Sequence, residues 1–192
     1  MITIIDNILT PSYATAIEED LLRPEYPWLY LDDVTYNDRT TNPGLVSIIY
    51  DRGKPMNEWY PFIKPALYCI ADAVNAPIKN VLRVRIGFLL QEHTPPRPST
   101  PHVDFLYPHY TACYYVNDSD GDTVVYDQTL DDVGVDKTDK IVEDYVSRTE
   151  FTAAKTCSPR KGSVCIFDGK HFHSSTNPYK NRKRLVLTVN WN

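Results

Sequence analysis

The sequence predicts a mainly β protein, folded as an antiparallel sandwich or jelly roll. Its 192 residues include 14 tyrosines and 15 prolines but only 7 glycines. Aromatic residues suit pleated surfaces and proline interrupts helices, so this composition favours strands and loops. In the second half of the chain, short β-prone segments follow one another closely. Turn signals such as Asp120-Gly121 and Asp168-Gly169 separate them, as is typical of these all-β folds.

The first 80 residues add two helical patterns. Residues 12–22 place apolar side chains near helical spacing, and Pro24 stops the pattern. Residues 59–74 show the same spacing, although Pro65 lies inside it and argues against a regular helix. No internal repeat or linker divides the chain, so we expect a single domain.

Strands are expected wherever β-branched and aromatic residues cluster between turn signals. These segments are residues 2–5, 45–50, 81–90, 111–116, 123–126, 151–155, 163–167 and 185–191. Residues 127–150 form the one long connection, and connections of this length are often lids or binding loops. We expect this connection and the proline-rich segment 94–101 to gate the mouth of the fold, with the latter joining neither sheet.

Cysteine usage and hydropathy indicate the cellular setting. No apolar run approaches the ~18 residues that a membrane span needs. The first residues lack the features of a signal peptide, so we expect a cytoplasmic protein with no membrane partner. The four cysteines form no C-x-x-C pair and lie in apolar or strand-like contexts, which predicts buried reduced thiols. They are Cys69, Cys113, Cys157 and Cys165.

The charge distribution is uneven. The net charge is −5, which argues against a dedicated nucleic-acid binder. Residues 117–150 hold 11 acidic and 3 basic side chains, whereas residues 155–184 hold 8 basic side chains and one acidic one. The basic segment is either a solvated face or a surface that faces an anion.

A set of metal-ligand residues is the strongest functional signal. In the triplet His102-Val103-Asp104, alternate residues of an extended chain point the same way, so both outer side chains can reach one ion. A second histidine, His173, follows far along the chain. Two imidazoles and one carboxylate form the facial triad of non-haem iron(II) sites, which leaves coordination positions open. A histidine close to an aspartate on a surface is the ordinary alternative for the triplet alone.

Arg184 lies 11 residues after His173 and opens the apolar strand at 185–191. A buried arginine offers a fixed, planar cation that binds a carboxylate through two hydrogen bonds. The order of triplet, histidine and arginine therefore suits a metal site that also binds an organic acid.

In order and spacing, these segments resemble the prolyl-hydroxylase-like branch of the iron(II)- and 2-oxoglutarate-dependent oxygenases, a group also common in bacterial viruses. The matching segments are residues 102–104, 111–117, 121–126, 167–173 and 184–189. The resemblance implies a double-stranded β-helix, braced on one sheet by N-terminal helices. We therefore expect one oxygenase domain over residues 1–192, with its core at 81–191 and helical support in 1–80.

Carried over to this chain, the resemblance implies that His102, Asp104 and His173 bind iron. It implies that Arg184 pairs with the C5 carboxylate of 2-oxoglutarate and that Tyr115 hydrogen-bonds the same group. For Tyr115 the alternative is plain packing, because alternate aromatic residues on a core strand are usually buried for that reason alone.

Two positions have a competitor nearby. His171 would share the face of His173 in an extended segment, and Arg182 lies nine residues after His173. The distance from the Asp-Gly turn favours His173, and the register of the last strand favours Arg184.

The implied activity is hydroxylation of a C–H bond with Fe(II), 2-oxoglutarate and O2, supported by ascorbate. The first substrate that the resemblance suggests is proline in a peptide or protein. A free amino acid or other small metabolite is the alternative, and nucleic acid is disfavoured. A non-catalytic jelly-roll binding module and a cupin-type metal enzyme without 2-oxoglutarate are further alternatives, but the three ligands and Arg184 argue against them.

Overall fold

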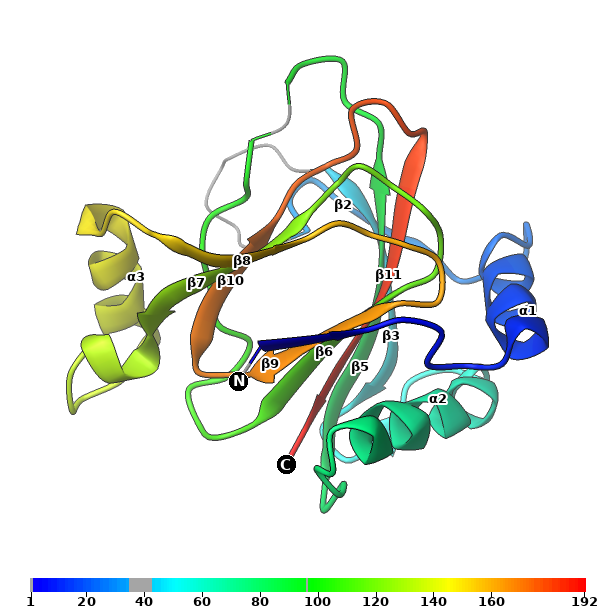
Figure 1. Cartoon of the computed structure of the whole chain (residues 1–192), viewed down its shortest axis with the longest axis horizontal. Coiled ribbons are helices and arrows are strands. Elements are labelled where there is room, and N and C mark those ends of the chain that lie inside the picture. Colours follow the sequence, from blue (N-terminus) through cyan, green and yellow to red (C-terminus); the bar gives the residue numbers. More distant parts are fainter. Residues whose placement is uncertain (1, 35–42, 96) are drawn as a thin grey trace.

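The computed structural model describes residues 2–34, 43–95 and 97–192. Two antiparallel sheets form most of the fold, and Figure 1 shows α1 and α2 on the outer side of the larger one. In spatial order, the large sheet contains β1 (Ile2–Ile5), β9 (Val164–Asp168), β6 (Tyr110–Tyr115), β11 (Lys183–Trp191), β5 (Val81–Leu90), β3 (Gly44–Asp51) and β2 (Leu29–Leu31), with β4 (Lys54–Pro55) paired to β3. The small sheet contains β10 (His171–Ser175), β7 (Thr123–Thr129) and β8 (Ala153–Cys157).

Strand alternation divides the large sheet into two faces. On β11, Leu185 and Leu187 belong to the core cluster under the helices, whereas Arg184 and Val186 line a cavity between the sheets. The same alternation on β5 turns Val84 toward the helices. Because successive side chains of a strand point to opposite faces, one register fixes which residues enter the cavity.

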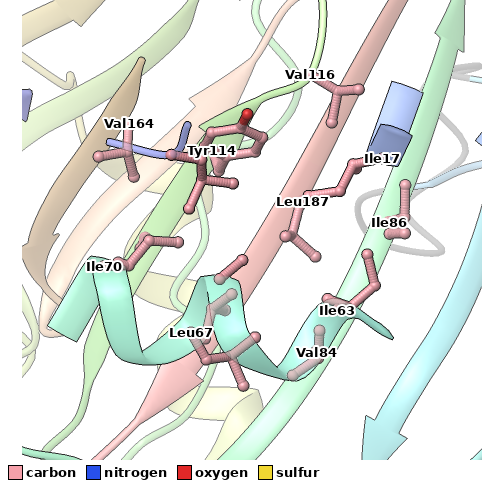
Figure 2. Close-up of a cluster of buried hydrophobic side chains, with 14 of the residues drawn as sticks. Ile17, Ile63, Leu67, Ile70, Val84, Ile86, Tyr114, Val116, Val164 and Leu187 are labelled. Carbon is pink, nitrogen blue, oxygen red and sulfur yellow. The ribbon is translucent and has the colours of Figure 1, made fainter. Parts of the chain in front are cut away.

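Helices α1 (Pro11–Leu21) and α2 (Tyr60–Ala73) cover the outer face of the large sheet. Figure 2 shows Ile63, Leu67 and Ile70 of α2 pointing at side chains of the sheet. Pro65 does lie inside α2, but on its exposed side. The carbonyl that loses its helical partner there can bind water, and apolar burial on the opposite face keeps the segment helical.

The Leu67→Ala protein is expected to lose about 2–5 kcal/mol of unfolding free energy, because Leu67 is fully buried between α2 and the sheet. Urea denaturation followed by circular dichroism measures this loss. Tyr68→Ala on the exposed side of the same helix is the matched control, with an expected change within about 0.5 kcal/mol. Equal losses in the two proteins would contradict the packing described here.

The N-terminal part supplies the strands that the sequence predicts at residues 2–5 and 45–50 as well as the helices. Strand β1 extends the large sheet beyond β9, and β3 extends it on the other side beyond β5. The two-residue strand β4 and the three-residue strand β2 were not expected from the sequence, since such short segments carry no periodicity. The described residues before β5 therefore extend the large sheet as well as cover it.

The acidic connection is not the irregular loop that we expected. It contains the end of β7, a short 3-10 helix at Leu130–Asp132 and helix α3 (Asp139–Arg148). Val142 of α3 is buried in a cluster with Leu130 and Phe172. Figure 1 shows α3 beyond the small sheet, on the far side from α1 and α2. The segment is thus packed on the small sheet, and its role as a gate stays a prediction.

The described residues of the proline-rich segment 94–101 belong to no strand of either sheet, as expected, but two hydrogen bonds connect the segment to the small sheet. The backbone N–H of Ser99 donates to the carbonyl of Ser175 on β10 at 2.8 Å, and the hydroxyl of Ser99 accepts from the N–H of Ser175. Pro96, within the same segment, lies outside the described residues. These two bonds fix the position of Ser99 shortly before His102, and the role of the segment as a gate stays a prediction.

The cysteine prediction holds for three of the four thiols. Cys113, Cys157 and Cys165 are buried and free, with 2.8 Å between the sulfurs of Cys157 and Cys165. The prediction is wrong for Cys69, which is exposed on α2. Within the described residues, no helix is long and apolar enough to cross a membrane.

Candidate metal centre

The structure brings His102, Asp104 and His173 together although 71 positions separate the first and last of them. Their potential ligand atoms all lie within 4.8 Å of one another. His173 Nε2 is 3.8 Å from Asp104 Oδ2, and the centroids of the two imidazole rings are 4.4 Å apart. Two imidazole nitrogens and one carboxylate oxygen can therefore bind one ion from one side.

Backbone pairing sets this geometry. His102 and His173 form an isolated antiparallel bridge in which each N–H donates to the other carbonyl at 2.9 Å. The intervening side chains point the other way, so that Val103 and Phe172 lie in the apolar cluster under α3. The alternation that buries Val103 and Phe172 is therefore what directs the polar side chains inward.

A β-bulge separates the two competing histidines. The register of β10 against β7 shifts between His171 and His173. His171 Nδ1 lies 2.9 Å from the carbonyl oxygen of Tyr126, away from the cluster. Without the bulge, residues two apart would share a face, so this irregularity places His173 alone at the centre.

Both histidines of the cluster are oriented by backbone carbonyls. His102 Nδ1 lies 3.1 Å from the carbonyl oxygen of Thr100, and His173 Nδ1 lies 3.4 Å from that of His171. A carbonyl at Nδ1 favours the proton there and directs Nε2 to the metal. Burial, followed by the neighbouring His173, lowers the pKa of His102 to about 3, and burial also lowers the pKa of His173. Both rings are thus neutral, which is the form that binds metal.

Asp104 is held by three residues that sequence reasoning missed. Arg83 on β5 forms a salt bridge to one carboxylate oxygen. The amide of Asn190 on β11 donates to the other oxygen at 2.8 Å, and the hydroxyl of Thr111 on β6 lies 3.4 Å from it. Burial by itself raises the pKa of Asp104, but Arg83 and the two histidines outweigh it and hold that pKa well below its usual range. The carboxylate is therefore ionised and fixed in orientation.

The Asn190→Ala protein is expected to bind Mn(II) about 10- to 100-fold more weakly than the wild type, because residues that orient a ligand contribute that much to metal affinity. Calorimetric titration measures the change. Asn181→Ala, which removes an exposed amide elsewhere, is the control and should bind Mn(II) normally. Unchanged affinity in Asn190→Ala would show that Asp104 needs no such support.

Arg184 lies in the same cavity as the triad. Its side chain is buried, and Nη2 donates to the hydroxyl of Thr123 at 2.7 Å. Gly121 makes room for it, because a Cβ at that position would lie 2.8 Å from Arg184 Cδ and 2.6 Å from a backbone oxygen. In the described part of the chain, Arg184 Nε has no hydrogen-bond partner and no carboxylate is paired with the guanidinium. A buried cation in this state is suited to an anionic ligand.

Neither Arg182, the competitor of Arg184, nor the expected ligand-binding residue Tyr115 lines the cavity. Arg182 is exposed and precedes β11, so it does not share the surroundings of Arg184. The ring of Tyr115 is fully buried, with the Arg184 guanidinium carbon 5.9 Å from its centre. Its hydroxyl donates to the carbonyl of Cys157 at 3.4 Å, and the residue is not among those that line the cavity. The expected hydrogen bond from Tyr115 to a ligand therefore stays a prediction.

The basic segment 155–184 is mainly a solvated face. Lys161 pairs with Glu18 on α1, and Lys170 pairs with Asp131 in the acidic connection. Of the eight lysines and arginines in this segment, Arg184 is the one that lines the cavity. The charge pattern thus reflects pairing between segments, and one residue of it faces the predicted anion site.

The donor set fits iron and 2-oxoglutarate. The triad offers three ligand atoms on one side of an ion. Elsewhere on the wall of the same cavity, Arg184 offers a guanidinium that no described carboxylate pairs with. Serine, threonine and apolar side chains line the space between them. They include Thr123, Ser174, Ser175, Val186 and Thr188.

No protein-family model matches the sequence, and no curated protein sequence matches it either. Solved structures do match it. The non-haem alpha-ketoglutarate-dependent epimerase SnoN from nogalamycin biosynthesis superposes with a TM-score of 0.68 at 13% identity, covering 99% of this chain and 77% of that one. A prolyl hydroxylase from Trichoplax adhaerens, in complex with a hypoxia-inducible-factor peptide, gives a TM-score of 0.62 at 13% identity, covering 99% and 82%.

HygX from Streptomyces hygroscopicus, solved with nickel, 2-oxoglutarate and hygromycin B, gives a TM-score of 0.61 at 12% identity, covering 100% of this chain and 82% of that one. At such identities the likeness shows the fold. The chain has the double-stranded β-helix fold of the iron(II)- and 2-oxoglutarate-dependent oxygenases, as the sequence predicted.

Proposed function

We propose that the protein is an Fe(II)- and 2-oxoglutarate-dependent oxygenase that hydroxylates a C–H bond. The single observation that carries this proposal is one cavity lined both by the His-Asp-His triad and by the buried guanidinium of Arg184, which no carboxylate pairs with in the described part of the chain. A metal enzyme without 2-oxoglutarate would not need the second feature. A binding module would need neither.

Each residue then has a defined task. His102, Asp104 and His173 hold the iron and leave its other positions open. Arg184 and Thr123 bind the C5 carboxylate of 2-oxoglutarate, which directs the opposite end toward the metal. When bound, iron and 2-oxoglutarate supply the oxidising chemistry, in which O2 and 2-oxoglutarate are consumed, succinate and carbon dioxide are released, and a C–H bond becomes C–OH. Two of the similar structures support this cofactor assignment. SnoN was solved with Fe3+ and alpha ketoglutarate, and HygX was solved with nickel and 2-oxoglutarate.

The surroundings of the site assist that chemistry. Arg83 and Asn190 keep Asp104 ionised and fixed, so the negative ligand does not need to lose a proton when the metal binds. His173 is buried and the other two ligands are half-buried between the sheets, which limits the access of water and protects a reactive centre.

For the substrate, proline in a peptide or protein is the first proposal, and the prolyl hydroxylase among the similar structures supports it. A free amino acid or other small metabolite is the second, supported by the structures solved with hygromycin B and nogalamycin RO. The acidic balance of the chain disfavours nucleic acid as a partner.

Release of succinate tests the proposal. Wild-type protein is incubated with Fe(II), ascorbate, O2 and 2-oxoglutarate, with and without pools of peptides and metabolites. We expect succinate to form, faster when the pool contains the substrate, and not to form with Asp104→Ala. Iron-loaded wild type that releases no succinate under any of these conditions would contradict the proposed function.

A further inference from the structure

A third arginine, Arg85 on β5, lines the same cavity. Alternation along β5 turns Arg83, Arg85, Gly87 and Leu89 to the cavity, while the residues between them face the helices. Arg85 lies opposite Thr188 on β11, and Leu89 lies opposite Arg184. Arg85 and Arg184 are therefore four residues apart along the strand direction. At about 3.3 Å for each residue, their backbones are separated by roughly 13 Å along the strands.

The other charges of the cavity are already assigned. Arg83 is paired with Asp104, and in the proposed function Arg184 binds one end of 2-oxoglutarate while the metal binds the other. Arg85 donates to the carbonyl of Val34, which carries no charge. Within the described residues, no carboxylate lies within salt-bridge distance of it. In the described part of the chain, Arg85 is thus a cation of the cavity wall that is paired with no carboxylate.

Removing the Arg85 guanidinium from water costs free energy unless an anion pairs with it. Burial, followed by the neighbouring Arg83, lowers the pKa of Arg85 to about 10, so the guanidinium remains charged at neutral pH. Beside it, Gly87 leaves space. Among the described residues, a Cβ there would come within 4 Å of Val186 Cγ1 alone, at an ordinary 3.5 Å. An open position next to a fixed, planar cation is suited to a carboxylate bound through two hydrogen bonds.

We propose that Arg85 is a substrate-binding residue that holds a carboxylate of the substrate beside the metal. The inference rests on the proposed function and narrows its substrate class to molecules that carry a carboxylate. Arg83 lies two residues before Arg85 on β5 and forms a salt bridge with the metal ligand Asp104. A carboxylate bound to Arg85 therefore places the neighbouring carbons of the substrate near the metal ligands. The carboxylate belongs either to a free amino acid or similar small acid, or to an acidic side chain of a peptide.

Binding to the Mn(II)- and 2-oxoglutarate-loaded protein tests this proposal without turnover. The probes are the free amino acids, small mono- and dicarboxylic acids, their primary amides, and N-acetylated amino-acid amides that stand in for residues within a peptide. Calorimetry gives affinities, and broadening of ligand proton signals by Mn(II) reports which carbon lies near the metal. The variants are Arg85→Gln, Arg85→Lys and, as a surface control, Arg182→Gln.

We expect at least one acid to bind the wild type and its amide to bind about 10- to 100-fold more weakly, because a hydrogen-bonded charge pair is lost. Arg85→Gln should show the same loss for the acid, Arg85→Lys a smaller one and Arg182→Gln none, with the affinity for 2-oxoglutarate unchanged in all three. Binding of free acids would place the carboxylate on a small molecule. Binding only of the N-acetylated amides of aspartate or glutamate would place it on a peptide.

The proposal is wrong if no acid binds, if amides bind as well as acids, or if Arg85→Gln binds the acid normally. A melting curve for Arg85→Gln shows whether the variant is folded, and the Arg85→Lys series gives the comparison if it is not. The same probes are measured on the metal-free protein. If the wild type binds neither Mn(II) nor 2-oxoglutarate, the proposed function is contradicted. The measurements on the metal-free protein then still show whether acid binding depends on Arg85.

Discussion

The His102→Ala and Asp104→Ala proteins are expected to bind Mn(II) at least about 100-fold more weakly than the wild type while keeping their fold. Each mutation removes one of three ligand atoms that lie within 4.8 Å of one another. The loss should exceed the 10- to 100-fold that residues orienting a ligand contribute. Isothermal titration with Mn(II) measures it, and circular dichroism follows the fold.

His93→Ala is the matched control for these two proteins, because His93 is exposed and lies outside the cluster. It should bind Mn(II) as the wild type does. If both His102→Ala and Asp104→Ala kept wild-type affinity, the ion would be bound elsewhere and the central assignment would fail.

Arg184→Ala is expected to weaken 2-oxoglutarate binding by about 2–5 kcal/mol, which is the cost of leaving a buried carboxylate without its cation. At 1.4 kcal/mol for each factor of ten, the dissociation constant rises by roughly 30-fold or more. Titration of 2-oxoglutarate into the Mn(II)-loaded protein measures this. Mn(II) affinity should stay unchanged, since Arg184 is not part of the cluster of potential metal ligands.

Arg182→Ala is the control that separates the two competing arginines. Arg182 is exposed, so its removal should change 2-oxoglutarate affinity little. The opposite order, with Arg182→Ala the weaker binder, would mean that the register of β11 against β5 and β6 is wrong.

Local patterns in the sequence were sufficient for most of the regular elements. The expected strand at 81–90 coincides with β5, and the expected helix at 59–74 contains α2 despite Pro65. The metal-ligand triplet could also be recognised from a local pattern. Side chains alternate along an extended segment, so His102 and Asp104 point the same way and can contact one ion.

Features that depend on residues far apart in the sequence could not be predicted. Asn190 and Arg83 are 107 positions apart, and only the pairing of β11 with β5 shows that both reach Asp104. An arginine within an apolar strand was a usable signal for Arg83 and Arg85, since such a side chain needs a polar reason to face inward. Helix α3 was missed because its polar composition hides one apolar face, which packs under Val103 and Phe172.

The register shift between His171 and His173 is the clearest example of a feature that the sequence could not predict. Alternation alone gives both histidines the same face, and the spacing argument chose between them without a physical cause. The structure supplies that cause in the register shift against β7 and in the contact of His171 with the carbonyl of Tyr126.

The central claim is that one cavity binds a metal and 2-oxoglutarate together, and anaerobic absorption spectroscopy with Fe(II) tests it most directly. Chelation of Fe(II) by the keto acid produces a visible charge-transfer band that neither component gives alone. We predict that this band appears when Fe(II) and 2-oxoglutarate are both added to the wild type, that Asp104→Ala does not show it, and that Arg184→Ala needs much more 2-oxoglutarate to reach it. Wild-type protein that binds Fe(II) but develops no band at saturating 2-oxoglutarate would contradict the account.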